Sequence, residues 1–170
     1  RADLTHREYS PSELQDYIYG SAEAIGLLCL QIFLAEEDVS PADRAAMERG
    51  ARALGSAFQK INFLRDLRED SSTLGRTYFQ QAPSGRIDEA TKSALIAEIR
   101  RELATAALTI DLLPASARVG VSAAADIFGE LTNRLAATPA TALATTRVSV
   151  PNHTKAWLAA RAVRRRGHSS

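Results

Sequence analysis

Residues 59–70 read Q-K-I-N-F-L-R-D-L-R-E-D, a stretch that indicates an embedded helix with one polar face. Asn62, Asp66 and Asp70 recur every four residues, which stacks them on a single face of a helix. Apolar residues cover most of the remaining circumference: Leu54, Ala57, Phe58, Ile61, Phe63, Leu64 and Leu67. Because apolar residues lie on several sides, this helix is expected to pack inside a bundle of helices.

The polar face of this helix predicts a metal site. An unpaired carboxylate is costly to bury, so the face must meet a polar partner or a cavity. Carboxylate and amide oxygens suit a hard cation such as Mg²⁺, which leaves coordination positions open for phosphate oxygens. We therefore predict that Asn62, Asp66 and Asp70 bind a metal beside a pocket, with Gln59 on the same stripe. The alternative is an ordinary solvated acidic face.

Capping signals predict the other helices. Ser-Pro-Ser-Glu at 10–13 and Ser-Pro-Ala-Asp at 40–43 each combine an N-cap with proline at the first helical position. Proline and glycine positions set the remaining boundaries. The expected helices span about 11–34, 41–70, 88–113, 116–137 and 153–165, with loops at 71–86 and 138–152. No alternating strand pattern is present, so the predicted fold class is all-α.

Composition narrows the function. The 170 residues are 45% hydrophobic with a formal net charge of +1, so no strong positive field favours nucleic acid. The single cysteine, Cys29, lies in an apolar run and is expected to be an inert core thiol. The most apolar stretch, residues 25–34, is about half the length of a membrane-spanning helix. A cytoplasmic protein is expected, with peripheral contact to a membrane as the alternative. Residues 164–170 are expected to form a disordered basic tail.

Four segments resemble the phytoene and squalene synthases, the head-to-head prenyl transferases. A-L-G-S-A-F-Q-K-I-N-F-L-R-D-L-R-E-D at 53–70, followed by L-G-R-T-Y-F at 74–79, resembles the family's second aspartate-rich motif. E-L-Q-D-Y-I-Y-G-S-A-E-A-I-G-L-L-C-L-Q-I-F at 13–33 is similar to its Y-C-x-x-x-A-G-x-V-G helix. R-V-S-V-P-N-H-T-K at 147–155 resembles a late R-x-x-V-x-x-x-x-K segment, and R-A-D-L-T-H-R-E-Y at 1–9 an M-x-x-D-L-x-x-x-x-Y stretch.

This resemblance implies a helical bundle of the isoprenoid synthase type, incomplete at its N-terminus. The family's first aspartate-rich motif lies upstream of the stretch in which Arg1 falls, so residues 1–170 are expected to be the C-terminal part of one domain. Glu98 and Glu102 do not replace that motif, because they lie on an ordinary amphipathic helix. The chain alone is expected to be inactive, and to bind its upstream segment or a second copy through an exposed apolar groove.

The resemblance also implies an activity. Two geranylgeranyl diphosphates would condense head-to-head, through prephytoene diphosphate, to phytoene in carotenoid biosynthesis, with Mg²⁺ or Mn²⁺ as the cofactor. Asp66, Asp70 and Tyr17 would be catalytic, with Asn62 completing the metal ligands. The substrate-binding residues would be Gln59, Arg76, Tyr78, Ala22, Ile25 and Gly26.

Two residues raise separate questions about the site, and two other functions remain open. Glu23 stands where glycine is commoner, which puts the shape of the pocket in doubt, and Arg65 lies off the stripe and is expected to hold a neighbouring helix. One alternative is a squalene or dehydrosqualene synthase that uses farnesyl diphosphate. The other is a non-catalytic homologue or fragment that serves as an interaction module.

Overall fold

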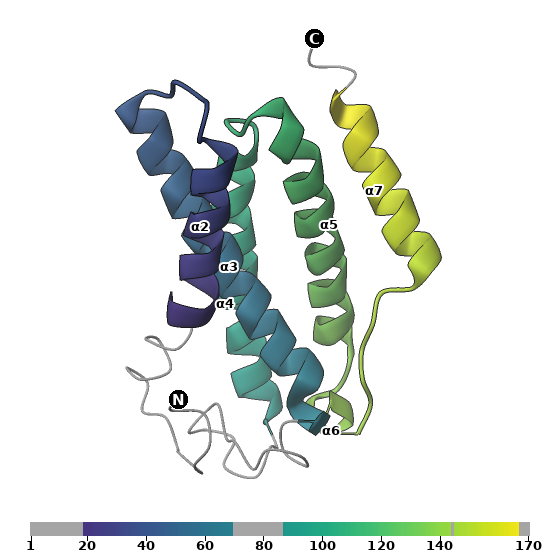
Figure 1. Cartoon of the computed structure of the whole chain (residues 1–170). Coiled ribbons are helices and arrows are strands. Elements are labelled where there is room, and N and C mark those ends of the chain that lie inside the picture. The colour runs from purple at the N-terminus through teal and green to yellow at the C-terminus, as the bar shows by residue number, and fades with distance from the viewer. Residues whose placement is uncertain (1–18, 70–86, 144, 167–170) are drawn as a thin grey trace.

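The structure, a computed structural model, describes residues 19–69, 87–143 and 145–166, and these residues form helices without strands. Their elements are η1 (Tyr19–Glu23, a π-helical turn), α2 (Ala24–Phe33), α3 (Pro41–Glu69), α4 (Glu89–Ile110), α5 (Ala115–Ala137), α6 (Ala140–Leu143) and α7 (Asn152–Arg166). Helices α2 to α5 form the bundle, and α7 runs along α5 on its outside (Figure 1). The predicted all-α fold is confirmed.

Local capping explains why the long helices begin where the sequence predicts. The backbone N–H of Asp43 donates to the Ser40 hydroxyl at 3.1 Å at the start of α3. The backbone N–H of Thr91 donates to Asp88 Oδ1 at 2.7 Å and lowers the pKa of that carboxyl below its ordinary value. Both bonds satisfy donors that a helix start leaves without partners.

The structure departs from the predicted elements in two places. The short helix α6 lies inside the predicted irregular stretch 138–152, because the Ala140 N–H donates to Glu89 Oε2 at 2.9 Å and Leu143 is buried. Helix α7 includes residues 164–166, which were expected to belong to a disordered tail. The predicted helix start near residue 10 and the predicted loop 71–86 lie outside the described residues.

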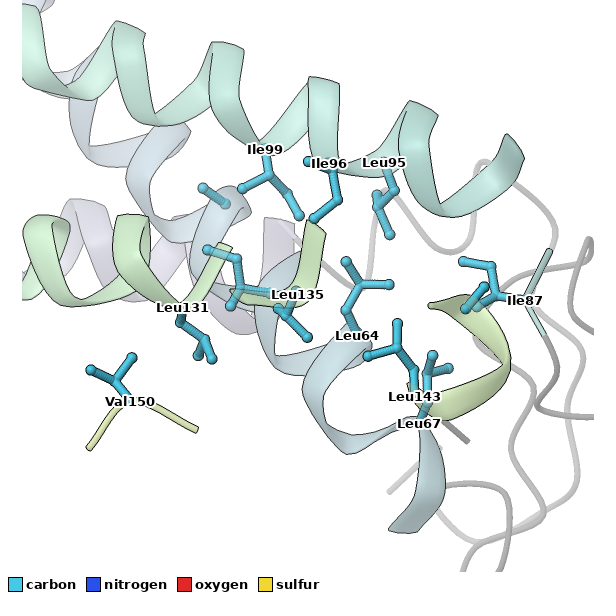
Figure 2. Close-up of a cluster of buried hydrophobic side chains, with 13 residues drawn as sticks. Leu64, Leu67, Ile87, Leu95, Ile96, Ile99, Leu131, Leu135, Leu143 and Val150 are labelled. Carbon is cyan, nitrogen blue, oxygen red and sulfur yellow. The ribbon is translucent and has the colours of Figure 1, made fainter. Parts of the chain in front are cut away.

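The main core lies where the C-terminal half of α3 meets α4, α5 and α6 (Figure 2). Ile61, Leu64 and Leu135 are fully buried at its centre. Lys60 joins α3 to α4 by donating to Glu98 Oε1 at 2.5 Å and Glu102 Oε1 at 2.6 Å. Helix α3 is therefore embedded as its apolar circumference predicts.

A second, smaller cluster joins the far ends of the helices. Leu30, Leu34, Met47 and Leu113 pack together where α2, the N-terminal half of α3 and the end of α4 converge. The two clusters hold α3 at both ends, so its central turns lie between them.

Element η1 and helix α2 both approach helix α3 closely at glycine positions. A Cβ atom added to Gly26 would lie 2.6 Å from the Ala51 carbonyl oxygen, and one added to Gly55 would lie 2.5 Å from the Ala22 carbonyl oxygen. Both distances are well below van der Waals contact, and the opposing atoms belong to the backbone. The close approach of η1 and α2 to α3 therefore requires glycine at these positions.

This packing predicts that Gly55→Ala destabilises the fold relative to Gly129→Ala. An added methyl group at Gly129 meets no atom of the described residues within 4 Å outside its own helix. Both changes gain the same helix propensity, about 1 kcal/mol, so their difference isolates the steric cost, about 1–3 kcal/mol. Urea unfolding of both variants measures it. Equal free energies of unfolding would contradict the close packing of η1 on α3.

Candidate active site

A pocket of about 580 Å³ lies between α2, α3, the C-terminal end of α4 and the N-terminal half of α5. Its walls are mainly apolar and include Leu30, Phe33, Met47, Leu54, Phe58, Ile110, Leu113 and Val121. Phe58 is held in place by stacking on Phe128 of α5, with ring centroids 3.8 Å apart. The volume and the apolar lining are typical of a site for a small organic ligand.

One end of the pocket is polar. The α3 residues that line it run from Met47 to Asn62, and the last two, Gln59 and Asn62, carry amides. Ser21 belongs to the same end, because its neighbour Ala22 lies against Gly55, one turn before Gln59. Elsewhere in the lining, the Thr109 hydroxyl is bonded to the Ala106 carbonyl at 2.9 Å. The pocket therefore has a long apolar body and a polar end near the end of α3.

The side-chain oxygen of Asn62 is buried without a hydrogen-bond partner among the residues that the structure describes. Burying an amide oxygen without a partner costs free energy, so a water, an ion or a ligand group bound at this atom would be stabilising. A metal ion or a hydrogen-bond donor from a bound molecule would satisfy it. This oxygen fits the metal-ligand role predicted for Asn62.

Asp66 lies one helical turn beyond Asn62 and is not among the residues that line the pocket. Arg65 holds both of its carboxylate oxygens, with Nε–Oδ1 2.8 Å and Nη2–Oδ2 2.6 Å. Arg147, from the segment before α7, lies 3.6 Å from Oδ1. This corner, next to the polar end of the pocket, therefore brings together one carboxylate and two guanidinium groups.

The structure brings five of the predicted site residues to one place. Gln59, Asn62, Ala22, Ile25 and Gly26 all line the pocket. Asp66 follows on the same helix. Four other predicted site residues lie outside the described part of the chain: Asp70, Tyr17, Arg76 and Tyr78.

Two expectations from the sequence, one for Cys29 of α2 and one for Glu23 of η1, differ from the structure. Cys29 is exposed and lines the pocket, so the expectation of an inert core thiol was wrong. The reason is that the apolar run continues onto an uncovered face, where Leu28 and Ile32 are 61% and 65% exposed. Glu23 lies 3.7 Å from Arg52 on α3 and is not among the lining residues, so it does not shape the pocket directly.

Sequence reasoning assigned no role to Arg147 and expected Arg65 to hold a neighbouring helix. The structure places both guanidinium groups on Asp66. For Arg147, the available signal was the R-V-S-V-P-N-H-T-K segment, which matched the family without indicating what its arginine contacts. Arginine is the preferred partner of phosphate oxygens, because its planar fork of donors matches their geometry.

Two negative findings apply to the described ranges. Within them, no three His, Cys, Asp or Glu side chains gather closely enough to hold a metal ion. The predicted stripe contributes one carboxylate there, since Asn62 is an amide and Asp70 lies outside. No helix in the same ranges is both long and apolar enough to cross a membrane.

Comparison with known proteins identifies the family. The squalene/phytoene synthase family model matches residues 1–154. The chain is 42% identical over 85 residues to phytoene synthase 3, chloroplastic, of Zea mays, covering 48% of this chain and 19% of that protein. It is 30% identical over 151 residues to the bifunctional lycopene cyclase/phytoene synthase of Phycomyces blakesleeanus, covering 74% of this chain and 24% of that protein.

Squalene and phytoene synthases are prenyl transferases, and the all-α bundle with its mainly apolar pocket agrees with that class. The chain is a member of the squalene/phytoene synthase family. It spans about a fifth to a quarter of the length of the curated relatives that it matches.

Proposed function

We propose that the protein containing this chain condenses two molecules of geranylgeranyl diphosphate head-to-head to phytoene. One observation carries this proposal: the long apolar pocket ends at Gln59 and Asn62, one helical turn before Asp66. A prenyl diphosphate has the same division, with a long hydrocarbon chain and a charged head. The names of the curated relatives, which are phytoene synthases, favour the twenty-carbon substrate.

The residues at the polar end fit a divalent cation. Asn62 and Asp66, together with Asp70, would hold Mg²⁺, with Mn²⁺ as a substitute. The buried amide oxygen of Asn62 supports this assignment, because it otherwise lacks a partner among the described residues. When bound, the ion supplies positive charge that stabilises a departing diphosphate. Gln59, which lines the pocket, would support the same site by hydrogen bonding.

The arginines at Asp66 provide a second source of positive charge for the leaving group. Arg65 and Arg147 both contact the Asp66 carboxylate, so their donors lie where a bound diphosphate would meet the end of α3. We assign them to diphosphate oxygens. Arg76, Tyr78 and Tyr17 remain predictions for the same site.

The apolar walls would guide the reacting carbons. Loss of diphosphate from one substrate leaves an allylic cation, which is attacked by the double bond of the second substrate. Loss of a proton then closes the cyclopropane ring of prephytoene diphosphate. A second ionisation, rearrangement and proton loss give phytoene. The pocket holds the chains in register and keeps water from the cations.

Farnesyl diphosphate remains the alternative substrate, for a squalene or dehydrosqualene synthase. A non-catalytic interaction module is the alternative of another class, and retention of Asn62 and Asp66 beside a pocket argues against it.

For location, we propose the cytoplasm, with contact at a membrane surface. Incubating the intact protein with Mg²⁺ and either prenyl diphosphate, then identifying the hydrocarbon formed, separates these proposals.

The shape of the pocket predicts that Gly120→Leu impairs use of the twenty-carbon substrate. Gly120 lines the pocket on α5, and space is open around it beyond its own helix. A leucine there fills part of the cavity, so kcat/KM for geranylgeranyl diphosphate should fall about tenfold or more, since misplacing bound chains slows the reaction. Gly129→Leu, also on α5 but outside this pocket, is the matched control. Equal kinetics of the two variants would exclude this pocket as the substrate site.

A further inference from the structure

A row of polar side chains crosses the interface between α3 and α4, and we call it the polar ladder. It consists of Ser56 and Lys60 on α3 and of Glu98 and Glu102 on α4. The Ser56 hydroxyl donates to Glu102 Oε1 at 2.8 Å. Lys60 Nζ donates to Glu98 Oε1 at 2.5 Å and to Glu102 Oε1 at 2.6 Å. The two residues on each helix are four positions apart, so the ladder joins facing stripes of two antiparallel helices.

The ladder is largely buried. Ser56 and Lys60 are 5% and 8% exposed, and the adjoining main core includes Leu64 of α3 and Ile99 of α4 (Figure 2). Glu102 Oε2 is buried without a hydrogen-bond partner among the residues that the structure describes. Burial removes solvation that the attraction between charges need not recover, and an oxygen without a partner adds to this cost. Stability alone therefore does not account for a charged side chain at Lys60.

The ladder and the polar end of the pocket share the same turns of α3. Gly55 and Gln59, which line the pocket, each stand immediately before a residue of the ladder. Asn62 follows Lys60 by two residues. Consecutive residues are separated by about 100° around a helix axis, so the two faces are neighbours on one rigid helix. A rotation or slide of α3 against α4 therefore moves the amides of Gln59 and Asn62 relative to the pocket walls.

We propose that Lys60 is a positioning residue for the polar end of the pocket. Through its two carboxylate partners it fixes the register of α3 on α4, because a hydrogen-bonded ion pair demands one geometry, whereas apolar side chains also pack in shifted arrangements. The register in turn directs the amides of Gln59 and Asn62. The consequence for catalysis rests on the function proposed above, whereas the effect on the register does not.

Replacing the central ion pair by apolar side chains separates positioning from stability. In Lys60→Met with Glu102→Met, the Ser56 hydroxyl can bond a carbonyl of its own helix, and Glu98, whose side chain is 44% exposed, remains solvated. We expect the urea midpoint of the intact protein to stay unchanged or increase, because charges are no longer buried. Glu130→Met with Arg134→Met is the matched control, since it removes an ion pair that lies within α5.

Kinetics of the intact protein give the first readout. In the Lys60 double variant, kcat for geranylgeranyl diphosphate should fall about tenfold or more, since a small misplacement of binding groups slows a reaction strongly. The Mg²⁺ concentration for half-maximal activity should increase, because Asn62 is a proposed metal ligand. The α5 control should keep both values. Glu102→Gln, which retains an acceptor for Ser56 and Lys60, should also keep most of the activity.

A distance between the two helices gives a readout that does not depend on the reaction. Spin labels are attached to cysteines introduced at Ala45 of α3 and Ala94 of α4, both exposed, in the intact protein with its native cysteines replaced by serine. Double electron–electron resonance should show one narrow distance distribution when the ladder is present. The Lys60 double variant should give a shifted or broader distribution, because an apolar interface specifies its register less well.

Two results would overturn the proposal. The same distance distribution in the Lys60 double variant and in the α5 control would show that the register does not depend on the ladder. A lower urea midpoint with unchanged kcat would assign the ladder to stability alone. Absence of phytoene from the unmodified protein would instead contradict the function proposed above, and the spin-label distances would still decide whether the ladder sets the register.

Discussion

Asp66→Ala in the intact protein is expected to reduce turnover of geranylgeranyl diphosphate by about a thousandfold, which corresponds to about 4 kcal/mol on the barrier. The reason is the loss of a carboxylate that we propose as a metal ligand at the polar end of the pocket. The same change also releases Arg65 and Arg147, which contact this carboxylate. Rates of phytoene formation at saturating substrate and Mg²⁺ measure the effect.

The fold should survive this substitution. The Asp66 side chain is 20% exposed and its partners Arg65 and Arg147 are 27% and 54% exposed, so these ion pairs contribute little to stability. The free energy of unfolding is therefore expected to change by no more than about 1 kcal/mol. Asp38→Ala, which removes an exposed carboxylate before α3, is the control for charge and should retain activity.

Asp66→Asn tests whether the carboxylate acts through a metal. The amide retains the shape of the side chain but loses its charge, so the Mg²⁺ concentration for half-maximal activity should increase. A purely structural role for Asp66 would leave that concentration unchanged. Near-normal turnover in Asp66→Ala would count against the proposed site altogether.

Local signals in the sequence predicted most of the helices. The start of α3 follows from Ser40 and Pro41, and the two ends of α5 follow from Pro114 and Pro139, whose effects are confined to a few neighbouring residues. The spacing of Gln59 and Asn62 placed both on one face of α3, and they line the pocket. The short helix α6 was missed, because its start is fixed by Glu89, 51 residues away in the chain.

Contacts between distant segments account for the other differences. Cys29 lies in an apolar run, but no periodic pattern indicated which face of α2 would remain uncovered. The contact of Arg147 with Asp66 joins residues 81 positions apart, and the sequence gives no local sign of it. Similarly, Gly26 was predicted to be a substrate-binding residue, whereas its missing Cβ also admits the Ala51 carbonyl of α3.

Residues 1–170 alone are expected to form no phytoene, even with excess Mg²⁺ and geranylgeranyl diphosphate. A head-to-head condensation must bind two diphosphates, whereas this chain carries one predicted metal-binding stripe. The chain spans about a fifth to a quarter of the relatives that it matches, so they contain much protein with no counterpart here. Incubation with labelled substrate, beside the intact protein as the positive control, measures the difference.

The exposed apolar face of α2 gives this prediction a second, independent readout. Ile25, Leu28 and Ile32 are 57%, 61% and 65% exposed, and Ile25 also lines the pocket. Apolar surface of this kind favours association, so the isolated chain should self-associate or bind a complementary upstream segment. Sedimentation velocity should show that Leu28→Glu with Ile32→Glu weakens self-association, whereas Leu108→Glu on α4, at an 82% exposed position, does not. Phytoene made by the isolated chain would show that one aspartate-rich stripe is sufficient. A strictly monomeric chain at high concentration would show that the face of α2 needs no partner.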